Sequence, residues 1–192
     1  YLEDVVKGGK GTRIVLSRTH PQFVAKLLEA QVPEIYEGII TIMGIARDPG
    51  NRAKVAIKCR DIGIDPLGSC IGYKGSRIQT IVQELRGERI DLVLWDEDIV
   101  KYICNALAPA EITRLVIDEN EKSAEIIIPD NQLAIAVGKR GVNIKLASKL
   151  IGWKLSVRAE SKGAKTAKDI DAELAQYLLD ENLVKKDDED KK

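Results

Sequence analysis

Two short segments of the chain place glycine and basic residues in the same order. Residues 70–78 read CIGYKGSRI and residues 136–144 read AVGKRGVNI, so the pattern apolar, Gly, x, basic, Gly, x, x, Ile recurs 66 positions later (138 minus 72). A glycine has no Cβ, so a phosphate group can approach its backbone closely. A helix that starts after the second glycine offers unbonded N–H groups and the positive end of its dipole. The repeated pattern therefore predicts two clamps for a nucleic-acid backbone, which position a strand without reading its sequence.

The residue types around the two glycine pairs define the candidate binding residues. Basic side chains supply charge for phosphates, and apolar side chains next to the turns could line a groove over which bases splay; Ile71 and Val137 are candidates for this lining. Ile78 and Ile144 could equally belong to the hydrophobic core, and an ordinary helix-to-helix turn is the alternative for both motifs. The predicted nucleic-acid-binding residues are Gly72, Tyr73, Lys74, Gly75, Arg77, Ile78, Gly138, Lys139, Arg140, Gly141, Ile144 and Lys145.

Other phosphate and catalytic chemistries fit the sequence less well. A P-loop would need glycine in place of Tyr73 and a serine or threonine directly after Lys74, where Gly75 stands. His20 is the only histidine, and the three cysteines form no C-x-x-C pair, so a zinc site lacks ligands. His20 precedes a proline and is expected at the surface or as a helix cap. We therefore expect no catalytic residue, no metal and no cofactor. The aromatic fraction of 4% also disfavours an aromatic stacking platform.

The glycine segments lie within a longer repeated frame that must position them. Alternating apolar segments precede them at 54–58 and 124–128 and follow them at 89–94 and 154–157, which predicts strands. Apolar residues at helical spacing follow each turn. The repeated unit is thus helix, strand, strand, helix, glycine turn, helix and strand. Further expected elements are a helix between Pro21 and Pro33, a short helix begun by Asp65-Pro66, a helix over 96–106 capped by Asp96, a strand over 112–117 and a helix from Asp130.

Composition and charge set limits on the rest of the chain. The 192 residues include 30 basic and 30 acidic ones, for a net charge of zero. From Glu160 onward there are 10 acidic and 7 basic residues, so the preceding part carries a net +3 (23 basic minus 20 acidic). Neutrality therefore does not argue against a nucleic acid, but it argues against indiscriminate, charge-driven binding. No apolar run reaches the roughly 18 residues of a membrane helix, and no leader pattern opens the chain. With cysteines expected to be reduced, we expect a cytoplasmic protein with no membrane partner.

The repeated frame resembles tandem type II KH domains, and more narrowly those of a bacterial transcription elongation and termination factor. The resemblance covers roughly residues 13–158 and is carried by the segments LSRTHP (16–21), VPEI (32–35), ARDPG (46–50), GERID (87–91) and ALAPA (106–110). It implies an α+β fold of two αββααβ units, each a three-stranded sheet packed on helices. In this family an S1 (OB-type) β-barrel precedes the KH pair, and residues 1–18 look like its last hairpin. The implied domains are 1–18, 19–95, 96–159 and a tail at 160–192 that contains a linker, an amphipathic helix and a charged end.

The resemblance also implies a function and partners. We expect a non-enzymatic, single-stranded RNA-binding part of a transcription factor, acting with RNA polymerase in pausing, termination and antitermination. The RNA would be the nascent transcript. RNA polymerase and other transcription factors would be bound mostly through domains that precede the KH pair in members of this family. We expect a monomer. The short junction at Trp95 and Asp96 predicts one continuous RNA path across both units. An RNA-processing enzyme that carries KH modules and a protein-interaction scaffold are the alternatives.

Overall fold

The structure, a computed structural model, describes residues 1–9 and 11–161. It divides into two compact units, Tyr1–Ala106 and the part from Leu107 onward. The domain limits expected from the sequence, at 18/19, 95/96 and 159/160, stay predictions. The amphipathic helix and charged tail expected after residue 160 lie outside the described residues.

An antiparallel hairpin opens the first unit. Its strands are β1 (Leu2–Gly8) and β2 (Gly11–Leu16), with Leu2 opposite Leu16 and Gly8 opposite Gly11. The hairpin predicted from the sequence is confirmed and is compatible with the end of an S1-type barrel. The Tyr1 ring stacks on His20, with 4.4 Å between ring centroids. His20 in turn caps the following helix, because its Nδ1 accepts a hydrogen bond from the Gln22 N–H at 3.1 Å.

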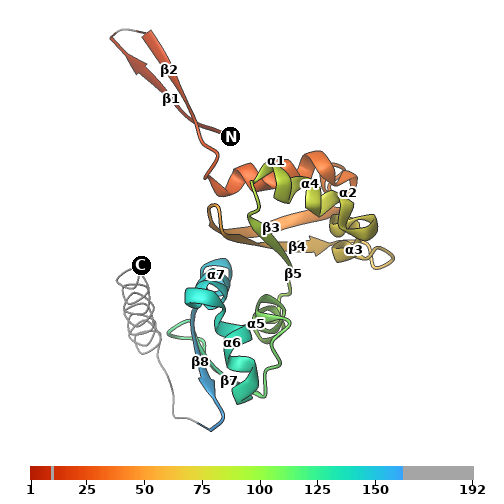
Figure 1. Cartoon of the computed structure of the whole chain (residues 1–192), viewed down its shortest axis with the longest axis vertical. Coiled ribbons are helices and arrows are strands. Elements are labelled where there is room, and N and C mark those ends of the chain that lie inside the picture. The colour runs from red at the N-terminus through yellow and green to blue at the C-terminus, as the bar shows by residue number, and fades with distance from the viewer. Residues whose placement is uncertain (10, 162–192) are drawn as a thin grey trace, which may run out of the picture. The chain divides into compact units, whose positions relative to one another are not determined.

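A three-stranded sheet covered by helices forms the rest of the first unit (Figure 1). The strand order is β3-β4-β5; β3 and β4 are antiparallel, and β5 is parallel to β4. A parallel neighbour requires a crossover connection, which here consists of α3, the first glycine turn and α4. The elements are α1 (Pro21–Gln31), α2 (Pro33–Tyr36), β3 (Ile40–Asp48), β4 (Arg52–Cys59), α3 (Pro66–Ile71), α4 (Ser76–Glu84) and β5 (Arg89–Leu94).

The core of the first unit lies between the sheet and its helices. Val24 and Leu28 of α1, Val55 and Ile57 of β4, and Ile81 of α4 are buried and belong to one hydrophobic cluster. Side chains alternate between the two faces of a strand, so Val55 and Ile57 point to the same face. This packing fixes the distance of α4 from the sheet and thereby the turn that precedes α4.

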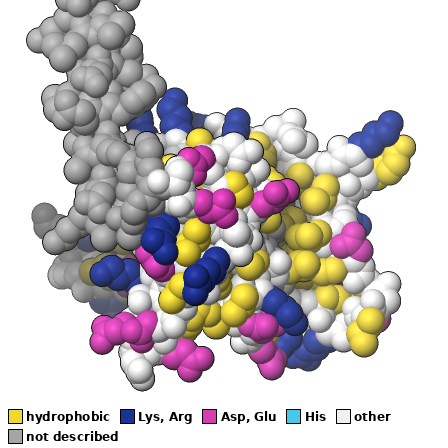
Figure 2. All heavy atoms as spheres, turned by 90° about the horizontal axis from the view of Figure 1, so that it is seen from below, with side chains coloured by type: hydrophobic (Ala, Val, Ile, Leu, Met, Phe, Trp, Pro, Cys, Tyr) yellow, Lys and Arg dark blue, Asp and Glu magenta, His cyan; other side chains and the backbone are white. Residues whose placement is uncertain are grey.

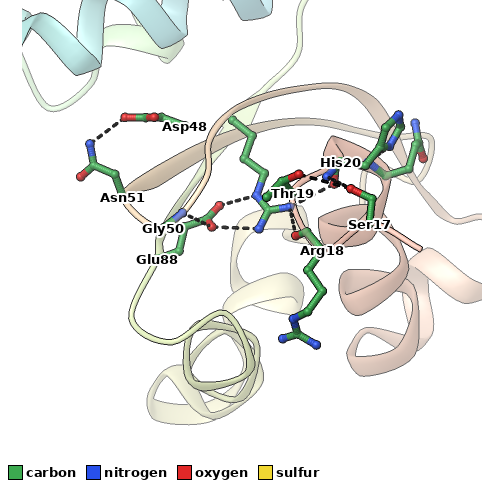
Figure 3. A network of polar contacts seen from close by, with 10 residues as sticks. Ser17, Arg18, Thr19, His20, Asp48, Gly50, Asn51 and Glu88 are labelled. Atoms are coloured by element: carbon green, nitrogen blue, oxygen red, sulfur yellow. Dashed lines mark hydrogen bonds and ion pairs between the residues drawn. The ribbon is translucent and has the colours of Figure 1, made fainter. Parts of the chain in front are cut away.

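A buried ion pair joins three segments of the first unit (Figure 3). The Arg47 guanidinium donates to both Glu88 carboxylate oxygens, from Nε at 2.7 Å and from Nη2 at 2.9 Å. Its Nη1 donates to the carbonyl oxygens of Arg18 and His20, while the Gly50 N–H donates to Glu88 Oε2. The side chains of Arg47 and Glu88 are 4% and 1% exposed. Because the charges and lone pairs are partnered, the network can hold the segment before α1 against the end of β3 and the start of β5.

The second unit repeats the same topology. Its sheet has the order β6-β7-β8, with β6 antiparallel and β8 parallel to β7. The two KH-type sheets predicted from the sequence are therefore confirmed. The elements are α5 (Ile99–Leu107), which spans the division between the units, and β6 (Arg114–Asp118), β7 (Ser123–Ile128), α6 (Leu133–Val137), α7 (Val142–Ile151) and β8 (Lys154–Ala159).

Two helix starts differ from the prediction. The helix expected from Asp96 begins at Ile99, because the Asp96 carboxylate accepts from the Asp98 N–H and the Asp98 carboxylate caps the helix by accepting from the Val100 N–H. The helix expected from Asp130 starts as a 3₁₀ turn over Asp130–Gln132 and becomes α-helical at Leu133. No helix among residues 1–9 and 11–161 is both long and apolar enough to span a membrane.

Candidate nucleic-acid interface

The two glycine turns have the same backbone conformation. Gly72 has φ 75° and ψ 173°, and Gly138 has φ 73° and ψ 169°. The basic residues also match, since Lys74 (φ 50°, ψ 28°) and Arg140 (φ 56°, ψ 27°) are both left-handed. Gly75 and Gly141 complete the turns in the left-handed region. The repeat found in the sequence is thus a repeat of geometry, and each turn joins two helices over one side of a three-stranded sheet.

The first glycine of each turn is required for two reasons. Its φ and ψ lie in a region that is open almost only to glycine. A Cβ on Gly72 would lie 2.7 Å from Cγ of Arg77, and a Cβ on Gly138 would lie 2.8 Å from Cβ and 3.1 Å from the backbone N of Asn143. The space that a Cβ would need is therefore filled by the first turn of the next helix, and the helix pair is brought into close contact.

Arg77 and Asn143 occupy equivalent places and tie the two helices of each pair together. Arg77 Nη1 donates to the Ser69 carbonyl oxygen at 2.6 Å and to Glu34 Oε2 at 3.0 Å. Asn143 Nδ2 donates to the Ala136 carbonyl oxygen at 2.9 Å and to that of Ile135 at 3.3 Å. Both side chains thus satisfy carbonyl groups at the end of the preceding short helix. Arg77, predicted as a phosphate contact, is in this structure engaged within the protein.

The predicted cations at the centre of the turns are exposed. The side chains of Lys74, Lys139 and Arg140 are all exposed. Tyr73 is 81% exposed, and the Lys74 ammonium lies 5.3 Å from the centroid of its ring. Lys145 is exposed one turn into α7, with its side chain beside Gly141. The structure therefore brings a solvent-facing basic group to each turn, as a phosphate contact requires.

The apolar candidates separate into two kinds. Ile144 is 6% exposed and is part of the core of the second unit, and Ile78 is half-buried against the core cluster of the first unit. Ile71 is 40% exposed directly before Gly72, and Val137 is half-buried directly before Gly138. Of the four, Ile71 therefore has the most surface to offer a base and Ile144 has the least.

The starts of α4 and α7 are open to an anion. Their N-cap positions are Gly75 and Gly141, and no side chain hydrogen-bonds the first-turn N–H groups as a cap. A helix usually begins with a serine, threonine, asparagine or aspartate whose side chain satisfies one of these donors. The N–H groups of Gly75 and Gly141 already donate to the Gly72 and Gly138 carbonyl oxygens, and those of Ser76 and Val142 to the Tyr73 and Lys139 carbonyl oxygens. With glycine at the cap, however, no side chain competes with a phosphate oxygen for the rest of the first turn and for the helix dipole.

A cluster of charged residues on the first sheet shifts the pKa values of two of its members, Lys54 and Asp91. Lys54 is almost fully buried, with Nζ 3.1 Å from Asp91 Oδ2, and Arg52 Nε lies 2.7 Å from the same oxygen. Burial lowers the pKa of Lys54, which the charge of Asp91 only partly offsets. Burial alone would raise the pKa of Asp91, but hydrogen bonds from Arg52 and the charge of Lys54 hold it below its usual value. The cluster links β4 to β5 and involves no turn residue.

The charges on the face of the molecule shown in Figure 2 favour local rather than general attraction of a polyanion. Figure 2 shows basic, acidic and hydrophobic side chains interspersed over the face that it displays.

Glu34 was not among the predicted site residues, although it lies beside the first turn through its ion pair with Arg77. The sequence holds no simple signal for that contact, because the two residues are 43 positions apart.

A pair of units with this sheet order, each with a G-x-x-G turn between the two crossover helices, defines a protein with tandem KH domains. The first unit matches the family model for the NusA-like first KH domain over residues 18–95, and the second matches that for the NusA-like second KH domain over residues 99–165. The chain therefore belongs to the NusA-like family of tandem KH proteins.

Curated relatives agree with this assignment, and one solved structure has a similar fold. The chain is 47% identical over 162 residues to the transcription termination/antitermination protein NusA of Halalkalibacterium halodurans, covering 84% of this chain and 42% of the relative. It is 45% identical to the protein of that name from Bacillus subtilis (84% and 43% covered) and to that from Rickettsia prowazekii (86% and 33% covered). The chain thus spans less than half of the length of these relatives. The crystal structure of APE1850 has a similar fold, with a TM-score of 0.55 at 20% identity over 73% of this chain and 97% of that one.

Proposed function

We propose that this chain is the single-stranded RNA-binding part of a transcription factor that acts with RNA polymerase in pausing, termination and antitermination. The observation that carries the proposal is the repeated turn, which has the same backbone angles and an exposed basic residue in both units. Each turn presents uncapped first-turn N–H groups to one phosphate of the strand, and the central cations neutralise its neighbours. The names of the curated relatives support the role in transcription.

The contribution of the chain is binding and not catalysis. Each KH unit takes about four nucleotides, held by backbone contacts that tolerate many sequences. Little chain separates the two KH repeats, because β5 of the first repeat ends at Leu94 and α5, which opens the second, begins at Ile99. We propose that one strand follows both turns as a continuous path, so that the second unit binds at a high effective concentration once the first is occupied. The protein would act as a monomer in the cytoplasm, where its transcript is made.

Charge reversal in each turn tests the backbone clamp. Lys74→Glu in the first unit, and Lys139→Glu with Arg140→Glu in the second, should each weaken binding of unstructured RNAs of different sequence by a similar factor, because phosphate contacts carry no sequence information. The measurement is fluorescence anisotropy with labelled single strands, with circular dichroism to confirm folding. Lys149→Glu is the matched control, because Lys149 is an exposed basic residue in the last turn of α7, away from the glycine turn; it should change RNA affinity much less. Unchanged binding by the folded variants of the turns would refute the clamp.

Strand length tests the continuous path separately. One RNA that is long enough for both units, about ten nucleotides, should bind much more tightly than two separate strands of half that length. Equal affinity of the long and the short strands would show that the two turns act independently, even if both bind RNA.

A further inference from the structure

The two turns share their backbone but differ in what they expose. At the position after the first glycine, the first turn carries Tyr73 and the second carries Lys139. Tyr73 is 81% exposed, although a tyrosine ring in a folded protein usually buries much of its apolar surface. Its neighbour Lys74 holds an ammonium 5.3 Å from the ring centroid, which leaves the ring flanked by positive charge. Exposed Ile71 adds apolar surface on the other side of Gly72.

The cations also differ between the turns. In the first turn, Arg77 Nη1 is engaged by the Ser69 carbonyl oxygen and by the Glu34 carboxylate, so part of its charge is balanced within the protein. The equivalent place in the second unit holds the neutral, buried Asn143, while Lys139 and Arg140 are both exposed. The first turn is therefore less positive and more aromatic than the second.

We propose that the Tyr73 ring stacks on a nucleobase of the bound strand, so that the first turn holds RNA by stacking together with charge and the second by charge. This inference rests on the proposed RNA-binding function and goes beyond it, because a backbone clamp alone contacts no base. Every base has a π-face, so the contact tolerates different sequences and favours strongly stacking bases. A single exposed ring in a turn differs from the aromatic platform that the composition disfavours.

Salt titration separates stacking from charge. Tyr73→Ala should weaken binding of a single-stranded RNA of about ten nucleotides by roughly 5- to 150-fold, the range for loss of one base–aromatic stack, without changing the slope of log affinity against log salt. Lys139→Ala, at the equivalent position, should make that slope shallower by about 0.7, the value for one phosphate of a single strand. Tyr73→Phe keeps the ring and should bind like the parent protein, whereas Tyr73→Leu should not.

Abasic nucleotides identify the stacked base. Removing single bases along the RNA should reveal one position where the loss weakens binding to the parent chain but has no further effect on Tyr73→Ala. If every abasic RNA weakens binding to both proteins equally, or if Tyr73→Ala changes the salt slope as Lys139→Ala does, the ring only positions Lys74 and the stacking proposal is wrong. If the parent chain binds no single-stranded RNA, the proposed function itself has failed, which is a separate outcome.

Discussion

Alanine at the first or the second glycine of the second turn should have clearly different effects on stability. At Gly138 the backbone occupies the region open almost only to glycine, which adds about 1–3 kcal/mol for alanine, and the new Cβ would lie 2.8 Å from Cβ and 3.1 Å from N of Asn143. Because the opposing atoms include backbone, the helix must shift, at about 1–3 kcal/mol for an overpacked site. Alanine also lowers the conformational entropy of the unfolded chain, which offsets about 0.4–1 kcal/mol of this destabilisation. We therefore expect Gly138→Ala to lower the free energy of unfolding by about 3 kcal/mol.

Gly141→Ala is the matched control within the same turn. Its φ is 68°, but the new Cβ would meet the Lys145 side chain at ordinary contact distances of 3.6 Å and 4.0 Å. Only the left-handed conformation then opposes alanine, at about 1–2 kcal/mol before the same entropy correction, so the net loss should be about 1 kcal/mol. The same order should hold for Gly72→Ala and Gly75→Ala in the first turn, where a Cβ would meet Arg77 at 2.7 Å and Gln79 at 3.9 Å.

Urea unfolding in single-tryptophan variants measures each unit by its own fluorophore. Trp95 follows β5 of the first unit and Trp153 precedes β8 of the second, so Trp95→Phe leaves a reporter for the second unit. The glycine variants are then compared at equal slope of free energy against urea. Equal losses for Gly138→Ala and Gly141→Ala, or a larger loss for Gly141→Ala, would refute the argument that close packing by Asn143 fixes the first glycine.

Three further predictions concern the protein framework. Glu88→Ala should lower the free energy of unfolding by about 3–5 kcal/mol, because it leaves the buried Arg47 charge unpaired; urea unfolding measures this, and a loss below about 1 kcal/mol, the range of an exposed pair, would contradict it. The lowered pKa of Asp91 means that its ionised form stabilises the fold above pH 3.8, and that this contribution is lost as the pH falls through the folded-state pKa. In the Asp91→Asn variant, the free energy of unfolding should therefore fall less steeply as the pH is lowered through this range. The variant should also be less stable at neutral pH, because Lys54 is left unpaired. Burial raises the pKa of the Cys70 thiol to about 11, so alkylation of the folded protein at neutral pH, followed by mass spectrometry, should label Cys70 only after urea is added.

The backbone conformation of the two glycine turns could be predicted from the sequence because it is specified locally. Glycine at two fixed places and a basic residue between them specify a backbone conformation over a few residues, and the repeat of the pattern in matched frames strengthens the prediction. The same holds for the helix begun by Asp65, whose carboxylate accepts from the Leu67 N–H. The cap of α5 was predicted wrongly: Asp98 rather than Asp96 caps the helix, because the Asp98 carboxylate accepts from the Val100 N–H.

The contacts between distant segments could not be predicted. Arg77 is predicted as a phosphate contact because its charge lies beside the turn, but the sequence does not show that Glu34, from a different helix, also pairs with it. Ile144 has the spacing of a groove residue and of a core residue at once, and only the packing of α7 shows that it is buried. Charge and periodicity in the sequence indicate which contacts a side chain can make, but its burial and its partners in the fold determine which contacts it makes.

The glycine-turn clamp can be tested most directly by the backbone amides themselves. In a ¹⁵N-labelled chain titrated with single-stranded RNA, the amide signals of Gly75 and Gly141 and of the first residues of α4 and α7 should shift most. Gly87 and Gly152, which lie beyond the opposite ends of the same two helices, are the internal controls and should stay in place. Large shifts at the controls with unchanged signals at the turns would show that RNA binds elsewhere and would contradict the account.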